Sequence, residues 1–234
     1  MHHMKFGYFW TSAALVGLVT VAGVGAAAAQ PGAPEKHPDF SGIWMTDKAY
    51  NQMPLPSSAM TPEGERILAR NKKGIAESDP NIDTSLACMP TGLPRSTLAN
   101  SPFVIIQTPK VLAMVGEPTS GRMRSICIGL EHIPGLTPQF HGDSVAHWEG
   151  DTLVVDVVNV DDRTFYNMPG IPHSKAFHAV EHFRFVNGGK LLEDKVDIDD
   201  PIIFTKPWSM TLDYARRTDV RPVEHVCSNQ RLRP

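Results

Sequence analysis

The sequence predicts a mainly β fold, a single antiparallel barrel or strongly curved sheet with one short helix near its N-terminus. From residue 103 onward, short runs rich in β-branched and aromatic residues follow one another, each bounded by Pro, Gly, Asn or Asp. No helical pattern alternates with these runs, which disfavours a parallel α/β sheet. Twenty prolines and eighteen glycines favour a chain rich in turns over a helical bundle.

Three regions are expected along the chain: a signal peptide over 1–29, a Pro-rich arm with the first strand over 30–60, and a β-barrel domain with a C-terminal tail over 61–234. Lys5 precedes a run of small apolar residues, and Ala27, Ala28 and Ala29 at its end fit the small-x-small pattern that signal peptidase reads. The alternative is a membrane anchor, but no basic stop-transfer cluster follows the run. The sequence therefore favours export to the periplasm or the medium, with no membrane contact after cleavage.

Each element has its own local signal. Thr61, Pro62 and Glu63 supply an N-cap hydroxyl, a proline at the first helical position and an acid in the first turn, so a helix is expected from here to about Lys73. Prolines disfavour helix over 74–102, which is expected to be mostly loop. About eight or nine sequential antiparallel strands are expected in all. Those after the loop are placed at 103–107, 111–117, 122–128, 143–148, 152–160, 177–187, 190–199 and 208–214.

The stretch from 141 to 160 predicts a hairpin with two chemically different faces. Gly150 supplies the positive φ that the first central position of a type II′ turn needs. Side chains alternate along a strand, so this turn determines which residues share a face. One face is expected to be dry and carries Ser144, Ala146, Trp148, Leu153, Val155 and Val157.

The other face of this hairpin carries polar groups set among valines and is a candidate site. His141, Asp143, His147 and Asp156 share it if the ladder extends to a pair between His141 and Val160. A carboxylate beside an imidazole fixes its tautomer and holds it for proton transfer. His141, Asp143 and Asp156 are therefore candidate catalytic residues. The alternative is a solvated outer face of the sheet.

The strand from 177 to 185 supplies a second candidate. Alternation places Glu181 on a face otherwise formed by phenylalanines and an alanine, and His178 on the opposite face. An unpaired buried carboxylate is costly. Glu181 is therefore expected to serve as a general acid or base, with His178 as a candidate proton carrier. The alternative is a buried structural pair with an arginine such as Arg124.

Further residues are expected to bind the substrate. Arg163 and Tyr166 lie in a loop after the hairpin and could orient the polar end of an anionic or phenolic molecule, although Arg163 could equally pair with a neighbouring aspartate. His173 lies in a stretch rich in histidine, and Trp148 lies on the dry face. No His-x-His or HExxH spacing is present, so no metal site is expected. A metal near His173 and His178 is left open.

Cysteines, charge and missing motifs narrow the class of protein. Export permits a disulfide, and Cys88 with Cys227 is the expected pair, whereas Cys127 lies in an apolar run and is expected to be a buried thiol. A net charge of −3 without a basic stripe makes nucleic acid an unexpected partner. No P-loop, dinucleotide fingerprint or G-x-S-x-G elbow occurs, so no cofactor is expected. The oligomeric state is left open.

A series of motifs gives the chain a resemblance to one family. In order, they are DFSGIW, CMPTGLPR, IIQTPKVLAMVGE, HWEGDTLVVDVVNVDDRTF, PHSKAFHAVEHFRF and DDPIIFTKPW. They resemble a large family of exported bacterial β-rich proteins with little functional assignment. The resemblance spans about 39–227 and implies export and a barrel-like fold, but no reaction. The Gly42-x-Trp44 step also resembles the first strand of lipocalin-type barrels, where the tryptophan plugs the closed end.

Barrels of the lipocalin kind serve as carriers and as cofactor-free isomerases, lyases and decarboxylases. We expect an exported enzyme of the lyase or isomerase type that uses His and carboxylate groups, without a cofactor, on a small hydrophobic or aromatic molecule in a barrel cavity. The rival expectation is a periplasmic carrier that binds an apolar ligand without turnover. A structural or interaction module is the third.

Overall fold

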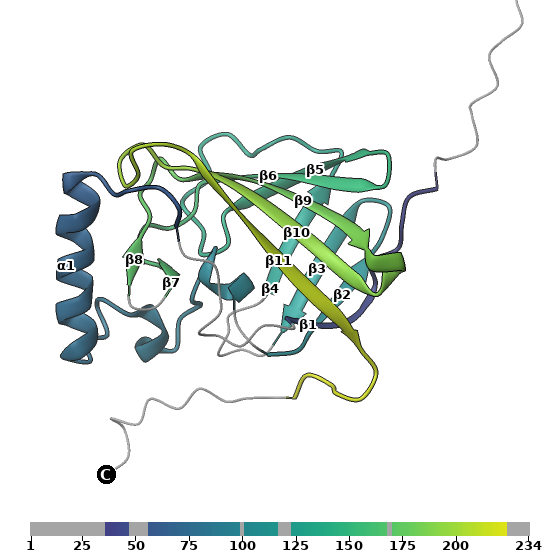
Figure 1. Ribbon diagram of the computed structural model, residues 1–234, viewed down its shortest axis with the longest axis horizontal. Helices are drawn as coiled ribbons and strands as arrows, with labels where there is room; N and C mark the ends of the chain where they lie inside the picture. Colours follow the sequence, from purple (N-terminus) through teal and green to yellow (C-terminus); the bar gives the residue numbers. More distant parts are fainter. Residues whose placement is uncertain (1–35, 47–55, 99–100, 117–122, 168–169, 224–234) are drawn as a thin grey trace, which may run out of the picture. The chain divides into compact units, whose positions relative to one another are not determined.

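The computed structural model describes residues 36–46, 56–98, 101–116, 123–167 and 170–223. The strands of this part form a closed barrel in the order β1-β11-β10-β9-β6-β5-β4-β3-β2, which confirms the predicted fold class (Figure 1). The first and last strands of the barrel, β1 and β11, pair with each other, and β1 also pairs with β2. The barrel strands are β1 Gly42–Thr46, β2 Phe103–Gln107, β3 Val111–Gly116, β4 Met123–Ile128, β5 Asp143–Glu149, β6 Thr152–Val158, β9 His178–Val186, β10 Leu191–Asp199 and β11 Trp208–Arg217.

The hairpin β5–β6 has the predicted register from Asp143, opposite Val158, to Glu149, opposite Thr152. Gly150 has a φ of +59°, as its turn requires. The prediction that His141 pairs with Val160 is wrong, because Gln139 bridges Val160 instead, in parallel. The chain turns at Gly142, whose φ is +67° and whose absent Cβ would lie 2.7 Å from the carbonyl oxygen of Val158.

The barrel departs from a simple up-and-down order at two places. β4 and β5 pair in parallel, because the connection over 129–142 brings the chain back to the same end of the barrel. β6 pairs with β9, and the intervening chain forms a small separate sheet of β7 Phe165–Asn167 and β8 Ile171–Pro172 where a loop was expected. Cys127 lies on the outer face of β4 and is a half-buried free thiol, so its predicted burial is wrong.

The predicted helix is α1, Pro62–Ala76, and ends three residues beyond the expected boundary. The hydroxyl of Thr61 accepts a hydrogen bond from the amide of Gly64 at 3.1 Å, which is the predicted N-cap. α1 lies outside the barrel beside β8 (Figure 1), where the Asn71 side chain donates to the carbonyl of Gly170 at 2.9 Å. No helix in the described ranges has the length and apolar character needed to cross a bilayer.

Trp44 packs against Phe185 near one end of the barrel. Its side chain is fully buried, and its indole N–H donates to the carbonyl of Phe40 at 2.8 Å. The guanidinium of Arg216 lies 4.4 Å from the centre of the Trp44 ring, a cation–π contact. Trp148 lies at this same end, tilted against the ring of Phe40.

A segment of the chain that is not a strand packs against inward-facing residues of the barrel strands. It runs from Thr91 to Leu98 and includes the 3-10 helix η3, Arg95–Leu98. Leu93, Thr97 and Leu98 are at most 3% exposed, so the segment belongs to the core although it carries no strand pairing. We call residues 91–98 the plug segment.

Candidate active site

A buried ion pair crosses the interior of the barrel. Alternation on β4 and β9 directs Arg124 and Glu181 inward, and both side chains are almost fully buried. One guanidinium nitrogen of Arg124 donates to Oε1 of Glu181 at 2.8 Å, and the other donates to Oε2. Arg124 also donates to the hydroxyl of Ser144, at 2.9 and 3.1 Å. Burial acts to lower the pKa of Arg124, but the facing charge of Glu181 outweighs it and raises that pKa.

A second carboxyl group lies beside this pair. Asp194 points inward from β10 between Phe183 and Leu212, and its side chain is 0% exposed. Neither of its oxygens has a hydrogen-bond partner among the described residues. Glu181 is opposite Val196 in the β9–β10 ladder, so Asp194 is its diagonal neighbour on the same face.

Asp194 favours its uncharged form. Burial, and then the charge of Glu181, raise the pKa of Asp194 well above 3.8, and the opposing effect of Arg124 does not cancel them. Two buried carboxyl groups therefore lie near one guanidinium, which donates hydrogen bonds to Glu181 and not to Asp194. An acid with a raised pKa beside a second carboxyl group is suited to general acid–base chemistry.

The carboxylate of Glu181 borders a small cavity of about 10 Å³, room for roughly one water molecule. The plug segment provides one wall through Leu93, Pro94 and Thr97. The barrel strands and the residue before β9 provide the rest, through Val157, Phe177, Ala179, Val196 and Met210. Among the described residues that line this cavity, Glu181 is the one with an ionisable side chain, and most of the others are apolar.

Asp194→Asn is expected to remove a pH-dependent loss of stability. The pKa of Asp194 is higher in the folded than in the unfolded chain, so stability is complete below the unfolded value, near 3.8, and is lost as pH rises toward the folded value. Over that range the free energy of unfolding of the wild type should fall by up to about 1.4 kcal/mol per pH unit relative to that of the variant. Urea unfolding of both proteins from about pH 4 to about pH 7 measures the difference. Equal slopes would show that Asp194 is ionised in the folded state.

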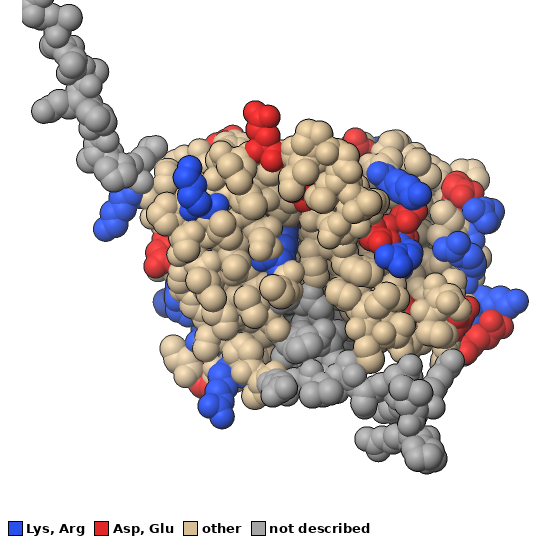
Figure 2. All heavy atoms as spheres, turned by 180° about the vertical axis from the view of Figure 1, so that it is seen from behind, with Lys and Arg blue, Asp and Glu red and all other residues tan. Residues whose placement is uncertain are grey.

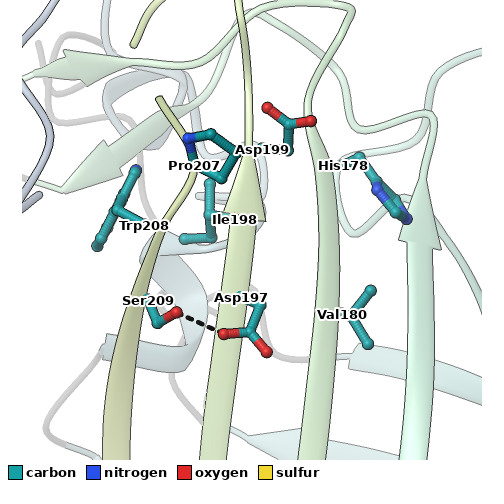
Figure 3. A pocket seen from close by; sticks show the side chains of 8 residues that line it. All are labelled: His178, Val180, Asp197, Ile198, Asp199, Pro207, Trp208 and Ser209. Carbon is teal, nitrogen blue, oxygen red and sulfur yellow. Dashed lines mark hydrogen bonds between the residues drawn. The ribbon is translucent and has the colours of Figure 1, made fainter. Parts of the chain in front are cut away.

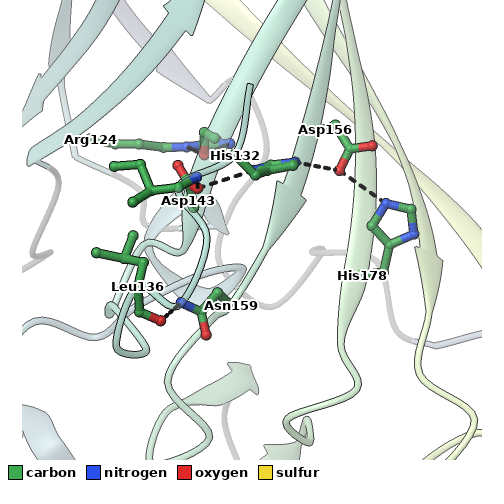
Figure 4. A network of polar contacts seen from close by, with 9 residues as sticks. Arg124, His132, Leu136, Asp143, Asp156, Asn159 and His178 are labelled. Atoms are coloured by element: carbon green, nitrogen blue, oxygen red, sulfur yellow. Dashed lines mark hydrogen bonds and ion pairs between the residues drawn. The ribbon is translucent and has the colours of Figure 1, made fainter. Parts of the chain in front are cut away.

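Three predicted catalytic residues meet on the outer face of the sheet, together with one that was not predicted (Figure 4). His132, from the connection after β4, lies with Nδ1 3.2 Å from Asp143 and Nε2 3.2 Å from Asp156. His178 approaches the same Asp156 oxygen at 3.1 Å. Carboxylates do lie beside imidazoles, as expected, but this face points away from the barrel interior and Asp156 is half-exposed. The hairpin face that points inward is the dry one.

Two open grooves adjoin this network of His and Asp side chains. His178 and Val180 on β9 line one of about 380 Å³, with Asp197 to Asp199 on the neighbouring strand β10 and Pro207 to Ser209 beside them (Figure 3). His132 and Asp156 line another of about 530 Å³. In the described part of the chain, no group of three or more His, Cys, Asp or Glu side chains is arranged to hold a metal ion. On the side of the molecule seen in Figure 2, charges of both signs are scattered and form no stripe.

The other predicted site residues lie apart from the cavity at Glu181. His141 is half-buried in the turn before β5. Arg163 is exposed, pairs with Asp161 at 2.6 Å, and covers the ring of Phe140 at 5.2 Å, which matches the alternative stated for it. Tyr166 is buried, and its hydroxyl donates to the sulfur of Met210 at 2.7 Å. Burial raises the pKa of Tyr166.

His173 and Trp148 also lie outside this cavity. His173 is buried with its Nε2 2.7 Å from the hydroxyl of Thr164, and burial lowers the pKa of His173, which favours the neutral ring. Trp148 is half-buried and stacks on His37. Cys227 lies outside the described residues, so its pairing with Cys88 stays a prediction.

The sequence interpretation missed Asp194 and His132. Asp194 interrupts an alternating apolar series at Leu192, Val196 and Ile198, which is the same signal that singled out Glu181. His132 lies in a connection with no periodicity, so nothing local marks it. Neither the protein-family models nor the curated proteins that were compared with the sequence gave a match.

Proposed function

We propose that the protein is an exported, cofactor-independent enzyme of the lyase or isomerase type that moves protons on a small hydrophobic or aromatic molecule inside the barrel. The observation that carries the proposal is the buried carboxyl group of Asp194, which lies beside the Arg124–Glu181 ion pair and has no hydrogen-bond partner within the described ranges. In this scheme Glu181, which borders the cavity, accepts a proton from the substrate. Asp194 supplies a proton to the cluster that it forms with Arg124 and Glu181, and the positive charge of Arg124 offsets the negative charge of the acids.

Replacement of Glu181 by glutamine tests this role. Purified protein is incubated with a panel of small aromatic and apolar compounds, and products are followed by mass spectrometry. Turnover of any converted compound should fall about 10²- to 10⁴-fold in Glu181→Gln. Glu149→Gln is the matched control, since that side chain is 65% exposed in the β5–β6 turn. If Asp156→Asn abolishes turnover while Glu181→Gln does not, the outer His–Asp network is the active site and the interior assignment is wrong.

A carrier is the second candidate, and one observation favours it. Both oxygens of Glu181 are engaged by Arg124, so the proposed base is satisfied without a reacting molecule. A carrier would bind a compound from the same panel and release it unchanged. Native mass spectrometry of the complex, followed by analysis of the released compound, separates the two functions.

Export and the disulfide belong to the same proposal. Residues 1–29 are proposed to be removed on export, and Cys88 is proposed to pair with Cys227 in the oxidising compartment. The N-terminal mass of protein recovered from the producing cells reports the cleavage site. Thiol counting of the unfolded protein, with and without a reductant, reports the disulfide. One free thiol before reduction and three after it is the expected result, since the sequence contains three cysteines.

A further inference from the structure

The plug segment occupies the place that a ligand would take in an open barrel. Leu93 and Pro94 present apolar side chains to the cavity that Glu181 borders. The hydroxyl of Tyr214, a fully buried residue on β11, donates to the main-chain carbonyl of Thr97 at 3.3 Å. The interior thus already holds an apolar body and an uncharged carbonyl oxygen, both supplied by the chain itself.

Tyr214 is linked to the cavity at Glu181 through Thr97, which accepts its hydrogen bond and also lines that cavity. Burial acts to lower the pKa of Arg124, but the charge of Glu181 and, to a smaller extent, Tyr214 raise it, and Arg124 contacts Glu181 directly. Glu181 and Thr97 line one cavity, so the base and the carbonyl bound by Tyr214 are neighbours. A molecule that displaced the plug segment would meet a carboxylate and a phenolic donor together.

We infer that the substrate is a small apolar compound with an uncharged carbonyl group, whose oxygen replaces the Thr97 carbonyl at the Tyr214 hydroxyl and whose apolar body replaces Leu93 and Pro94. This inference rests on the proposed function. Charge balance selects the carbonyl over its alternatives. A carboxylate would add a second negative charge beside Glu181, and an ammonium group would need Asp194 to ionise in an apolar interior.

The chemistry follows from this placement. Glu181 removes a proton from the carbon next to the carbonyl, and the electron pair of that C–H bond forms a C=C bond. The carbonyl π electrons move to the oxygen, where the hydrogen bond from Tyr214 stabilises the developing charge. Glu181, now protonated, returns the proton to carbon at the same or a conjugated position. No electrons leave the substrate, so no oxidant or reductant is required.

Three probes that share a benzene ring test the inference: acetophenone, benzoate and benzylamine. Binding is measured by NMR titration of the whole protein, and exchange of the acetophenone methyl protons in D₂O is followed in the same samples. Acetophenone alone should bind, and Leu93→Ala should tighten its binding by enlarging the cavity. Tyr214→Phe, which keeps the ring that packs on Phe103, should weaken binding about 2- to 10-fold, the net value of one hydrogen bond.

The outcomes separate this inference from the proposed function. Preferred binding of benzoate or benzylamine, absence of acetophenone binding even to Leu93→Ala, or unchanged affinity in folded Tyr214→Phe would each overturn the inference. Acetophenone binding that depends on Tyr214 but gives no methyl exchange would uphold the carbonyl site and overturn the enzymatic role. Exchange that is lost in Glu181→Gln, with binding retained, would support both.

Discussion

Replacing Arg124 with methionine is expected to lower the free energy of unfolding at neutral pH by about 3–5 kcal/mol. The side chain is buried and binds both oxygens of Glu181 and the hydroxyl of Ser144. Without it, Glu181 and Asp194 would be two buried acids with no counter-charge, and both would have to take up protons. The loss should therefore shrink at acid pH. Urea unfolding at two pH values measures it, and a loss below about 1 kcal/mol would mean that the pair is solvated.

The two acids should substitute for each other in this cluster. In Glu181→Gln, Asp194 can release its proton and balance the charge of Arg124. The free energy of unfolding should therefore fall by less than in Arg124→Met, by about 1–3 kcal/mol. In the double variant Glu181→Gln/Asp194→Asn no acid of the pair remains. The loss of unfolding free energy in the double variant should exceed the sum of the losses in the two single variants by about 0.5–3 kcal/mol. Additive costs would show that Asp194 does not respond to the charge of Glu181.

Leu93→Ala is expected to cost about 2–5 kcal/mol of stability and to create a place for a ligand. Leu93 is 3% exposed and forms part of the cavity wall, so its truncation extends the cavity beside Glu181. An apolar cavity of about 150 Å³ can bind benzene, so a small aromatic molecule should restore part of the lost stability as its concentration rises.

Thermal unfolding with and without acetophenone measures this recovery. Leu86→Ala is the matched control, because Leu86 belongs to the 3-10 helix η2, Thr84–Ala87, and is 44% exposed. Its truncation should change stability by no more than about 0.5 kcal/mol, with no gain from the ligand. An equal loss in both variants would show that the plug segment contributes little to the packed interior.

Most of the barrel could be predicted from local patterns. The strands between Phe103 and Tyr214 alternate regularly, and the turns at Gly150 and Asn187–Gly188 adopt the positive φ that their sequences favour. The parallel pairing of β4 with β5 could not be predicted, because it depends on where a long connection returns the chain. The plug segment was also missed, since its burial depends on the space left inside a closed barrel and not on its own periodicity.

The candidate site could be predicted only in part. Alternation identified Glu181, and Arg124 was named as a structural partner that the structure confirms. Alternation also put Asp143, Asp156 and His178 on faces apart from the dry one, but one strand pattern cannot show which face a closed sheet turns inward. The link from Tyr214 to Thr97 joins residues more than a hundred positions apart, and no local signal predicts it.

The pairing of β1 with β11 has a consequence for how the protein folds. The seam that completes the cylinder joins Ile43 to Arg217, so it forms only after nearly the whole chain is present. Contacts this distant in sequence are slow to form, because a long loop must first be closed. Until then β1 and β10 each expose an edge that another chain can pair with. Protein truncated before β11 should therefore self-associate rather than remain as a smaller barrel.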